Sequence, residues 1–147
     1  MNSSPGIIAL PEPETSGETP LETLLQQRRS VREYGEAALE LAAIGQLLWA
    51  AQGITDPQGL RTAPSAGALY PLELYVVAGN VEGLTPGVYH YQPDRHALQH
   101  TSTGDQRRLL AHAAHGQSWV RTAAAVVVIT AVYKRTTGKY ADRGVRY

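Results

Sequence analysis

Three arginines and a serine crowd into the stretch RRSVREY, residues 28–34. The planar guanidinium groups of Arg28 and Arg32 can donate hydrogen bonds to a phosphate or to carbonyl oxygens, and Ser30 adds a hydroxyl. The pattern alone favours a plainer interpretation, because cations at the end of a helix interact favourably with its dipole. The pattern alone therefore leaves an anion site and a solvated helix end as alternatives.

A second candidate is the proline-bracketed loop TAPSAGALYP, residues 62–71. Its residues Pro64, Ser65, Ala66 and Gly67 are small or rigid, so a flat ligand could lie against their backbone. Gly67 permits close approach or a positive φ, and Ser65 adds a hydroxyl donor. An ordinary loop leading into a strand has the same composition, since loops carry both turns and binding sites.

The third candidate is the segment KRTTGKYADRGVRY, residues 134–147, which carries five cations and a single anion. Lys139 and Tyr140 place an amine beside a phenol. If it were partly buried next to other cations, this amine could act as a general base near neutral pH. The alternative is a solvated basic tail.

Several classes of site have no support in the sequence. The five histidines fit no usual zinc spacing, and neither a phosphate-binding glycine loop nor a GxSxG nucleophile motif is present. The chain has no cysteine, which excludes disulfides, thiolate metal sites and a cysteine nucleophile. A formal net charge of zero argues against a general nucleic-acid binder.

The length and hydropathy of the chain predict one domain in the cytoplasm. A chain of 147 residues can bury a substantial core. No apolar run reaches the length of a membrane span and no signal peptide is visible, so no membrane partner is expected. Residues 1–19 are acidic and proline-rich, which predicts an extended arm or linker, or a disordered tail. Residues 20–147 are expected to form the folded domain.

The elements that must position the three candidates follow from periodicity. A capping box formed by Thr19 and Glu22, with Pro20 at the first helical position, predicts a helix that ends near Ser30. Apolar spacing predicts further helices over 39–52 and 105–115. These expectations place the arginines in the last turn of the first helix.

Strands are predicted by alternation and by β-forming composition. Residues 72–78, 88–93 and 97–101 are expected to form a meander. Residues 123–133 are continuously apolar, which predicts a central strand buried on both faces.

Five stretches then stand in a particular order: RRSVREY, LLWAAQGIT, RTAPSAGALYPLELYVV, GVYHYQPDRHAL and KYADRGVRY. This series resembles the nitroreductase-like flavoproteins, and within them the SagB/ThcOx-type dehydrogenases, which include the azoline oxidases of peptide natural-product pathways. The resemblance runs from about Pro20 to Tyr147. It implies a homodimeric α+β nitroreductase fold, with a central, mostly antiparallel sheet flanked by helices and FMN at the dimer interface.

The resemblance also assigns the cofactor contacts. Arg28, Ser30 and Arg32 match the motif that contacts the phosphate chain and the pyrimidine edge of the flavin. Arg29 lies within that motif and is expected to contribute backbone more than side chain. Residues 64–67 match the loop that packs on the isoalloxazine ring, typically from the partner chain.

Lys139 and Tyr140 match the Lys–Tyr pair implicated in the azoline oxidases. The implied reaction is hydride transfer to flavin N5 while one of these side chains takes a proton. The substrate would be an azoline or a related peptide-derived or small molecule, with a cyclodehydratase as a candidate partner. The alternative is a non-catalytic subunit or fragment that binds a peptide or partner enzyme without flavin.

In the family that the chain resembles, a helix, a glycine-rich segment and a return strand normally follow the position of Tyr147. Those parts complete the sheet and supply further FMN contacts. We therefore expect this 147-residue chain by itself to hold FMN weakly or not at all.

Overall fold

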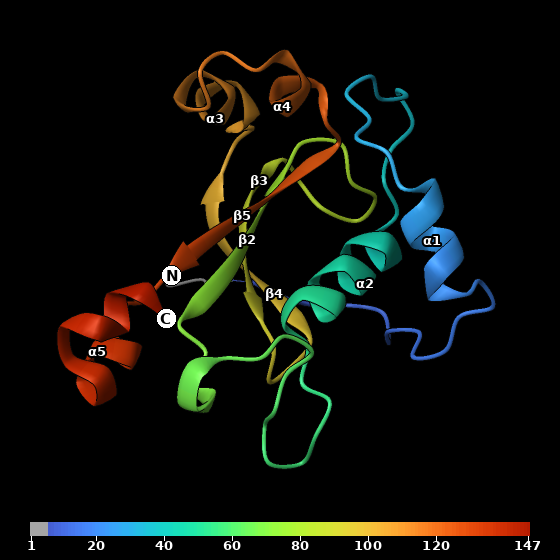
Figure 1. The fold of residues 1–147 in the computed structure, drawn as a ribbon. Helices are drawn as coiled ribbons and strands as arrows, with labels where there is room; N and C mark the ends of the chain where they lie inside the picture. The colour runs from blue at the N-terminus through green and yellow to red at the C-terminus, as the bar shows by residue number, and fades with distance from the viewer. Residues whose placement is uncertain (1–5) are drawn as a thin grey trace.

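The computed structural model describes residues 6–147, which fold around an antiparallel β-sheet flanked by helices (Figure 1). The strands are β1 (Ile7–Ala9), β2 (Leu72–Ala78), β3 (Gly87–Gln92), β4 (Ala97–Thr103) and β5 (Ala125–Ala131). They lie in the order β1-β4-β3-β2-β5, and each neighbouring pair is antiparallel. The predicted meander and the predicted α+β architecture are confirmed.

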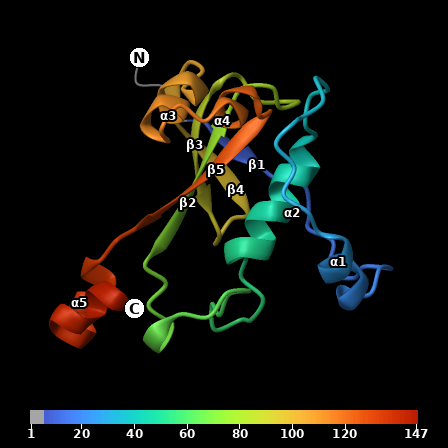
Figure 2. The ribbon, with the colours of Figure 1, turned by 45° about the horizontal axis from the view of Figure 1, so that its top comes forward.

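Short helices surround this sheet. They are α1 (Leu21–Gln27), α2 (Leu41–Gln52), α3 (Arg107–Ala113), α4 (Ser118–Thr122) and α5 (Lys134–Tyr140), with 3₁₀ turns η1 (Ala66–Ala68) and η2 (Ala141–Arg146). Two views place α2 alongside the meander, α3 and α4 together at one end, and α5 near η1 at the other end (Figure 1, Figure 2). The loop after α2 and the end of the chain therefore meet at one end of the sheet.

The core lies between α2 and one face of the meander. Ile44 and Leu48 are 1% and 0% exposed, and they belong to the same buried cluster as alternate residues of the strands. The strand residues of this cluster are Leu74, Val76, Ala78, Tyr89, Tyr91 and Leu98. Burying one large apolar side chain contributes about 1.5–3 kcal/mol. The packing of α2 therefore fixes the position at which the loop after it begins.

Most of the predicted elements lie where periodicity placed them. β2 spans Leu72–Ala78 as predicted, and the ends of α2, β3, β4 and α3 differ from prediction by no more than two residues. Apolar spacing was sufficient here because each element buries one face against a neighbour.

The prediction that residues 123–133 form a central strand buried on both faces is wrong. β5 lies at the edge of the sheet, beside β2. Its residues Val127 and Ile129 are 39% and 61% exposed. A continuous apolar run indicates that both faces of a strand are suited to burial, but it does not say whether this chain covers them.

The predicted start and end of the first helix are also wrong. Pro20 is the N-cap of α1, and no side chain bonds the free backbone N–H groups there. The helix ends at Gln27, and Arg28 follows as its C-cap with φ −56° and ψ 128°. The arginine segment therefore begins where the helix stops, which removes the interpretation of these cations as residues of a last helical turn.

The arm before α1 is attached to the domain. β1 pairs with β4, Leu10 is 7% exposed, and the Gln46 amide exchanges two hydrogen bonds with the Glu14 backbone at 2.8 and 2.9 Å. The disordered-tail alternative is therefore wrong for this part of the arm, and residues 1–5 lie outside the described residues. Within residues 6–147, no helix has both the length and the apolar character needed to cross a bilayer.

The α2 contact generates a first prediction. Replacing Leu48 with alanine should lower the free energy of unfolding by about 2–5 kcal/mol, because the buried site cannot collapse fully. The matched control is Leu47→Ala, one residue earlier and 57% exposed, which should change it by less than about 0.5 kcal/mol. Urea denaturation followed by circular dichroism measures both, and equal losses for the two variants would contradict the packing described for α2.

Candidate functional site

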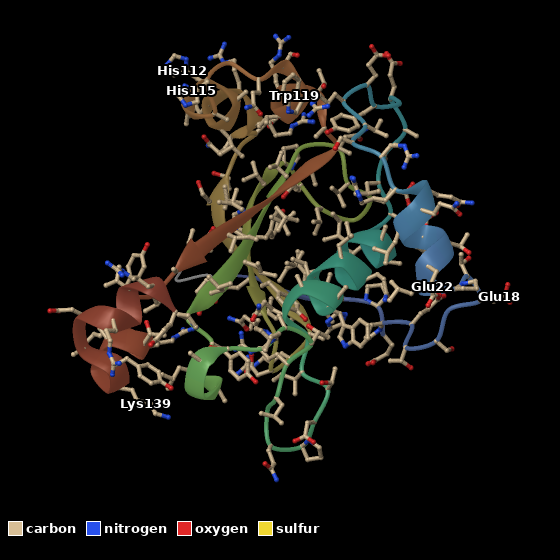
Figure 3. All side chains as sticks on the ribbon, in the orientation of Figure 1. Glu18, Glu22, His112, His115, Trp119 and Lys139 are labelled. Atoms are coloured by element: carbon tan, nitrogen blue, oxygen red, sulfur yellow. The ribbon has the colours of Figure 1, made fainter. Side chains whose placement is uncertain are left out.

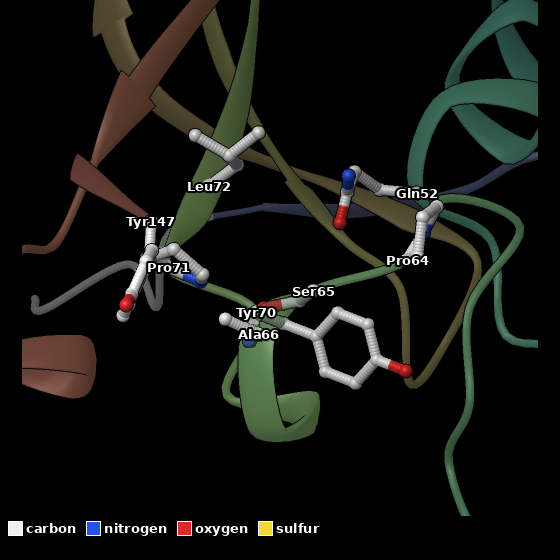
Figure 4. A pocket seen from close by; sticks show the side chains of 8 residues that line it. All are labelled: Gln52, Pro64, Ser65, Ala66, Tyr70, Pro71, Leu72 and Tyr147. Carbon is white, nitrogen blue, oxygen red and sulfur yellow. Dashed lines mark hydrogen bonds between the residues drawn. The ribbon is translucent and has the colours of Figure 1, made fainter. Parts of the chain in front are cut away.

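A cavity of about 210 Å³ opens where the end of α2, the loop before β2 and the last residue of the chain meet (Figure 4). Its walls are formed by Gln52, Pro64, Ser65, Ala66, Tyr70, Pro71, Leu72 and Tyr147. Three of the four loop residues singled out in the sequence, Pro64, Ser65 and Ala66, therefore line a real cavity. Gly67 follows them directly in η1.

This loop is held in a strained conformation. Gly67, Ala68 and Tyr70 have φ values of +64°, +54° and +43°, in the left-handed region that costs a non-glycine residue about 1–2 kcal/mol. The loop is closed from within, because the Tyr70 N–H donates to Ser65 Oγ at 2.9 Å and the Ala68 N–H donates to the Ser65 carbonyl at 3.0 Å. Backbone strain of this kind is concentrated at functional sites.

Lys139 and Tyr140 lie against the backbone of Gly67. A β-carbon placed on Gly67 would be 2.6 Å from Tyr140 Oη and 2.8 Å from Lys139 Nζ. The Lys139 ammonium also lies 5.5 Å from the centre of the Tyr140 ring. The structure therefore brings two of the three sequence candidates together, the small-residue loop and the Lys–Tyr pair. Lys139 remains exposed in this chain, so the burial that the general-base argument required is not provided by one chain alone.

The segment that carries this pair is not the solvated tail considered as an alternative. It forms α5 and η2, and Gly144 allows η2 to fold back on α5. A β-carbon on Gly144 would lie 2.5 Å from the backbone of Thr136, so a larger residue cannot be accommodated without backbone movement. This folding back brings the Tyr147 ring edge-on to Tyr140 at 5.0 Å and into the cavity wall.

A guanidinium group holds α5 to the sheet. Arg135, at the start of α5, donates to the Tyr70 carbonyl at 2.7 Å and pairs with Glu73 of β2 at 2.5 Å. Glu73 is 15% exposed in its side chain and also hydrogen-bonds His90 of β3. The His90 ring stacks on Tyr75 at 4.8 Å. One carboxylate thus joins two strands to α5, and the same arginine joins α5 to the end of the strained loop.

The charge state of Glu73 follows from these contacts. Burial by itself would raise the pKa of the Glu73 carboxyl, but hydrogen bonds from His90 and Arg135, together with their charges, bring it below its usual 4.5. The carboxylate is therefore ionised at neutral pH, in the form that binds Arg135.

The arginine segment lies apart from this cavity. Arg28, Arg29, Ser30 and Arg32 are all exposed. Arg29 folds back to donate to the carbonyls of Gln26 and Arg28 at 2.9 and 2.8 Å, so its side chain closes the end of α1. The side chains of Arg28 and Ser30 make no hydrogen bond or ion pair among residues 6–147.

Arg32 is anchored at the far end of the molecule. Its guanidinium lies 5.4 Å from the centre of the Trp119 ring of α4. Figure 3 shows Trp119 and Lys139 at opposite ends of the folded molecule. Within one chain, the arginine segment is therefore not brought to the small-residue loop and the Lys–Tyr pair.

The structure adds site residues that the motifs did not indicate: Gln52, Tyr70, Glu73, Arg135 and Tyr147. One signal was available for Gln52, since it stands four residues after Leu48 and so continues the buried face of α2 with a polar residue. Nothing in the sequence joined Glu73 to Arg135, because their pairing depends on how α5 returns to β2.

Known proteins that match this chain identify its class. The model of the nitroreductase family matches residues 25–147. A nitroreductase homologue of Methanocaldococcus jannaschii is 46% identical over 140 residues, which is 95% of this chain and 69% of that protein. The chain belongs to the nitroreductase family.

Solved structures agree with this assignment. A nitroreductase homologue from Ralstonia eutropha JMP134 aligns with a TM-score of 0.80 and 30% identity, over 100% of this chain and 66% of that one. A chain of the Escherichia coli microcin synthetase McbBCD complex, solved with truncated pro-MccB17 bound, shares the fold with a TM-score of 0.63 and 24% identity, over 90% of this chain and 63% of that one. This chain thus spans about two thirds of the length of these relatives.

The contact at Gly67 generates a second prediction. Gly67→Ala should lower the free energy of unfolding by about 1–2 kcal/mol, because alanine resists the positive φ. The new methyl group should also displace the side chains of Lys139 and Tyr140, which NMR chemical shifts detect. Ala68→Gly is the matched control, since it relieves a positive φ next door and should move neither side chain. Unchanged Lys139 and Tyr140 signals in Gly67→Ala would contradict the packing.

The Glu73 network generates a third prediction. Because the pKa of Glu73 is lower in the folded state than its usual 4.5, its stabilisation is complete above about pH 5 and is lost as the pH falls through the folded-state value. Glu73→Gln should therefore lower the free energy of unfolding by about 1–3 kcal/mol at pH 7, and by progressively less in acid.

The control is Asp105→Asn at the other end of the molecule. A side-chain hydrogen bond from Arg107 outweighs burial and lowers the pKa of Asp105, so this variant should show the same trend with pH. Cleavage by trypsin at Lys139 and Arg143 separates the two, because only Glu73→Gln should loosen α5 and accelerate it. Equal cleavage rates would show that Glu73 does not hold α5.

Proposed function

We propose that this chain is an FMN-dependent oxidoreductase that acts as a dehydrogenase. The observation that carries this proposal is the packing of Lys139 Nζ and Tyr140 Oη on the Gly67 backbone, beside a cavity, in a chain of the nitroreductase family. An amine and a phenol are groups that can move a proton. Because Gly67 has no β-carbon, both side chains can reach the backbone of the loop.

The residues present fit FMN when two copies of the chain are combined. A cavity of about 210 Å³ is smaller than the roughly 300–1,000 Å³ of typical ligand pockets, so one chain offers part of a site. Residues 64–67 would carry the ring of the flavin. Arg28, Ser30 and Arg32 are exposed and, with Arg32 on Trp119, do not reach this cavity. They would hold the phosphate chain of a flavin seated on the second copy. A homodimer with two composite sites follows from this division.

When bound, FMN supplies a carrier that accepts or donates a hydride. The chain itself contributes three things. The strained loop from Ser65 to Tyr70 gives the ring a rigid surface. Lys139 and Tyr140 hold or accept a proton at the mouth of the cavity. Arg135 keeps both of them in place through the Tyr70 carbonyl.

We propose an azoline or a related peptide-derived or small molecule as the substrate. Two similarities to a synthase and a synthetase support this choice, and the second was solved with a peptide bound. The indigoidine synthase of Streptomyces lavendulae is 41% identical over 70 residues, which is 44% of this chain and 6% of that protein. The microcin synthetase complex that shares the fold was solved with a truncated peptide, pro-MccB17, bound. A cyclodehydratase partner is part of the same proposal.

Flavin titration tests the proposal and gives a fourth prediction. The 147-residue chain should bind FMN weakly, so that quenching of FMN fluorescence saturates only at high protein concentration. Arg28→Gln should weaken FMN binding about 10- to 100-fold, because a hydrogen bond to a charged group contributes about 1.5–3 kcal/mol. Riboflavin lacks the phosphate, so its affinity should not change in this variant.

The control is Arg108→Gln, the same substitution at an exposed position of α3, which should leave both affinities unchanged. A wild-type chain that does not bind FMN at any accessible concentration would contradict the proposal and favour a flavin-free subunit. Sedimentation velocity of the FMN complex should give the mass of two chains.

A further inference from the structure

Gln52 is a buried polar side chain in the wall of the cavity. It is the last residue of α2 and is 6% exposed. Figure 4 shows its amide directed from α2 into the space between Leu72 and Ser65. Burying an amide costs free energy unless its hydrogen-bonding groups have partners. The partners of Gln52 therefore indicate whether its role is structural or lies in binding a ligand.

The orientation of this amide is set by Arg61. The guanidinium Nη1 of Arg61 lies 3.0 Å from Gln52 Oε1. A guanidinium has donors and no acceptor, so the oxygen of the amide must face it and the NH₂ group must face elsewhere. Arg61 is itself held, because its guanidinium lies 4.7 Å from the centre of the Tyr70 ring and its backbone N–H donates to Tyr70 Oη at 3.2 Å.

The NH₂ group of Gln52 has no partner within residues 6–147. None of the hydrogen bonds in this part of the chain has Gln52 Nε2 as its donor. Around it the cavity is lined by the apolar groups of Pro64, Ala66, Pro71 and Leu72. Gln52 Nε2 is not among the fully buried polar atoms of residues 6–147, so it meets solvent through the cavity. A ligand that places an acceptor there replaces this solvent contact, whereas an apolar ligand would leave the donor unsatisfied at a cost of about 1–3 kcal/mol.

We propose that Gln52 is a recognition residue that donates a hydrogen bond to an acceptor atom on the edge of the flavin ring. This inference rests on the proposed function, since it takes FMN as the occupant of the cavity. Gln52 selects a ring that carries a carbonyl oxygen or an unprotonated nitrogen at its rim. Arg61 is the positioning residue that presents the amide in the required orientation.

Gln52→Glu tests this role because it replaces the NH₂ group of the side chain and keeps the oxygen. The carboxylate keeps an oxygen for Arg61, so the contact that supports the fold remains. It replaces the NH₂ donor with an acceptor, which cannot bond another acceptor. We expect the affinities for FMN and for riboflavin to fall by the same factor, about tenfold or more, with a shift in the visible absorbance band of the bound flavin.

Two further variants complete the experiment. Gln52→Met removes the donor without adding charge and should also weaken both flavins, so it provides the result if Gln52→Glu fails to fold. Gln58→Glu makes the same chemical change on an exposed turn and should alter neither affinity. Thermal melts of all the chains establish that each is folded.

The outcomes separate this inference from the proposed function. A wild-type chain that binds no flavin overturns both. A wild-type chain that binds flavin, with Gln52→Glu and Gln52→Met binding as tightly and with the same spectrum, overturns the role of Gln52 alone. A loss confined to FMN, with riboflavin unaffected, also overturns it, because Gln52 would then act on the phosphate side.

Discussion

The site depends on one guanidinium group that holds the end of the chain against the loop in front of β2. Arg135 reaches from α5 to the Glu73 carboxylate and to the Tyr70 carbonyl. Without these bonds little would keep Lys139 and Tyr140 over Gly67, because α5 makes few other contacts with the sheet. Glu73 can serve as the anchor because His90 and Arg135 keep it ionised despite its partial burial. The position of the Lys–Tyr pair thus depends on the Glu73 carboxylate of β2 and on the His90 side chain of β3 that bonds it.

A second constraint is the separation of the arginine segment from the strained loop within one chain. The strained loop and the Lys–Tyr pair meet at one end of the sheet, while Arg32 is anchored on Trp119 at the other. In the proposed homodimer, a binding site assembled from two copies resolves this separation. Gln52 lines the same cavity as the strained loop. Its amide oxygen is held by Arg61, and its NH₂ group has no partner among residues 6–147.

The features that depend on neighbouring residues along the chain could be predicted from the sequence. Alternation located β2, apolar spacing located α2, and Gly67 was recognised as a point of close approach. The order of the motifs predicted the family, which the comparisons confirm. The features that could not be predicted depend on contacts between segments far apart in the sequence. The edge position of β5, the return of α5 to β2, and the Glu73–Arg135 pair all require the assembled fold.

A structure of this chain determined with FMN tests the central claim most directly. The account predicts the ring on the backbone of Pro64–Gly67, with Lys139 and Tyr140 at its edge and the phosphate against the arginine segment of a second copy. A flavin bound elsewhere, or an arginine segment left in solvent while the ring occupies the loop, would contradict it.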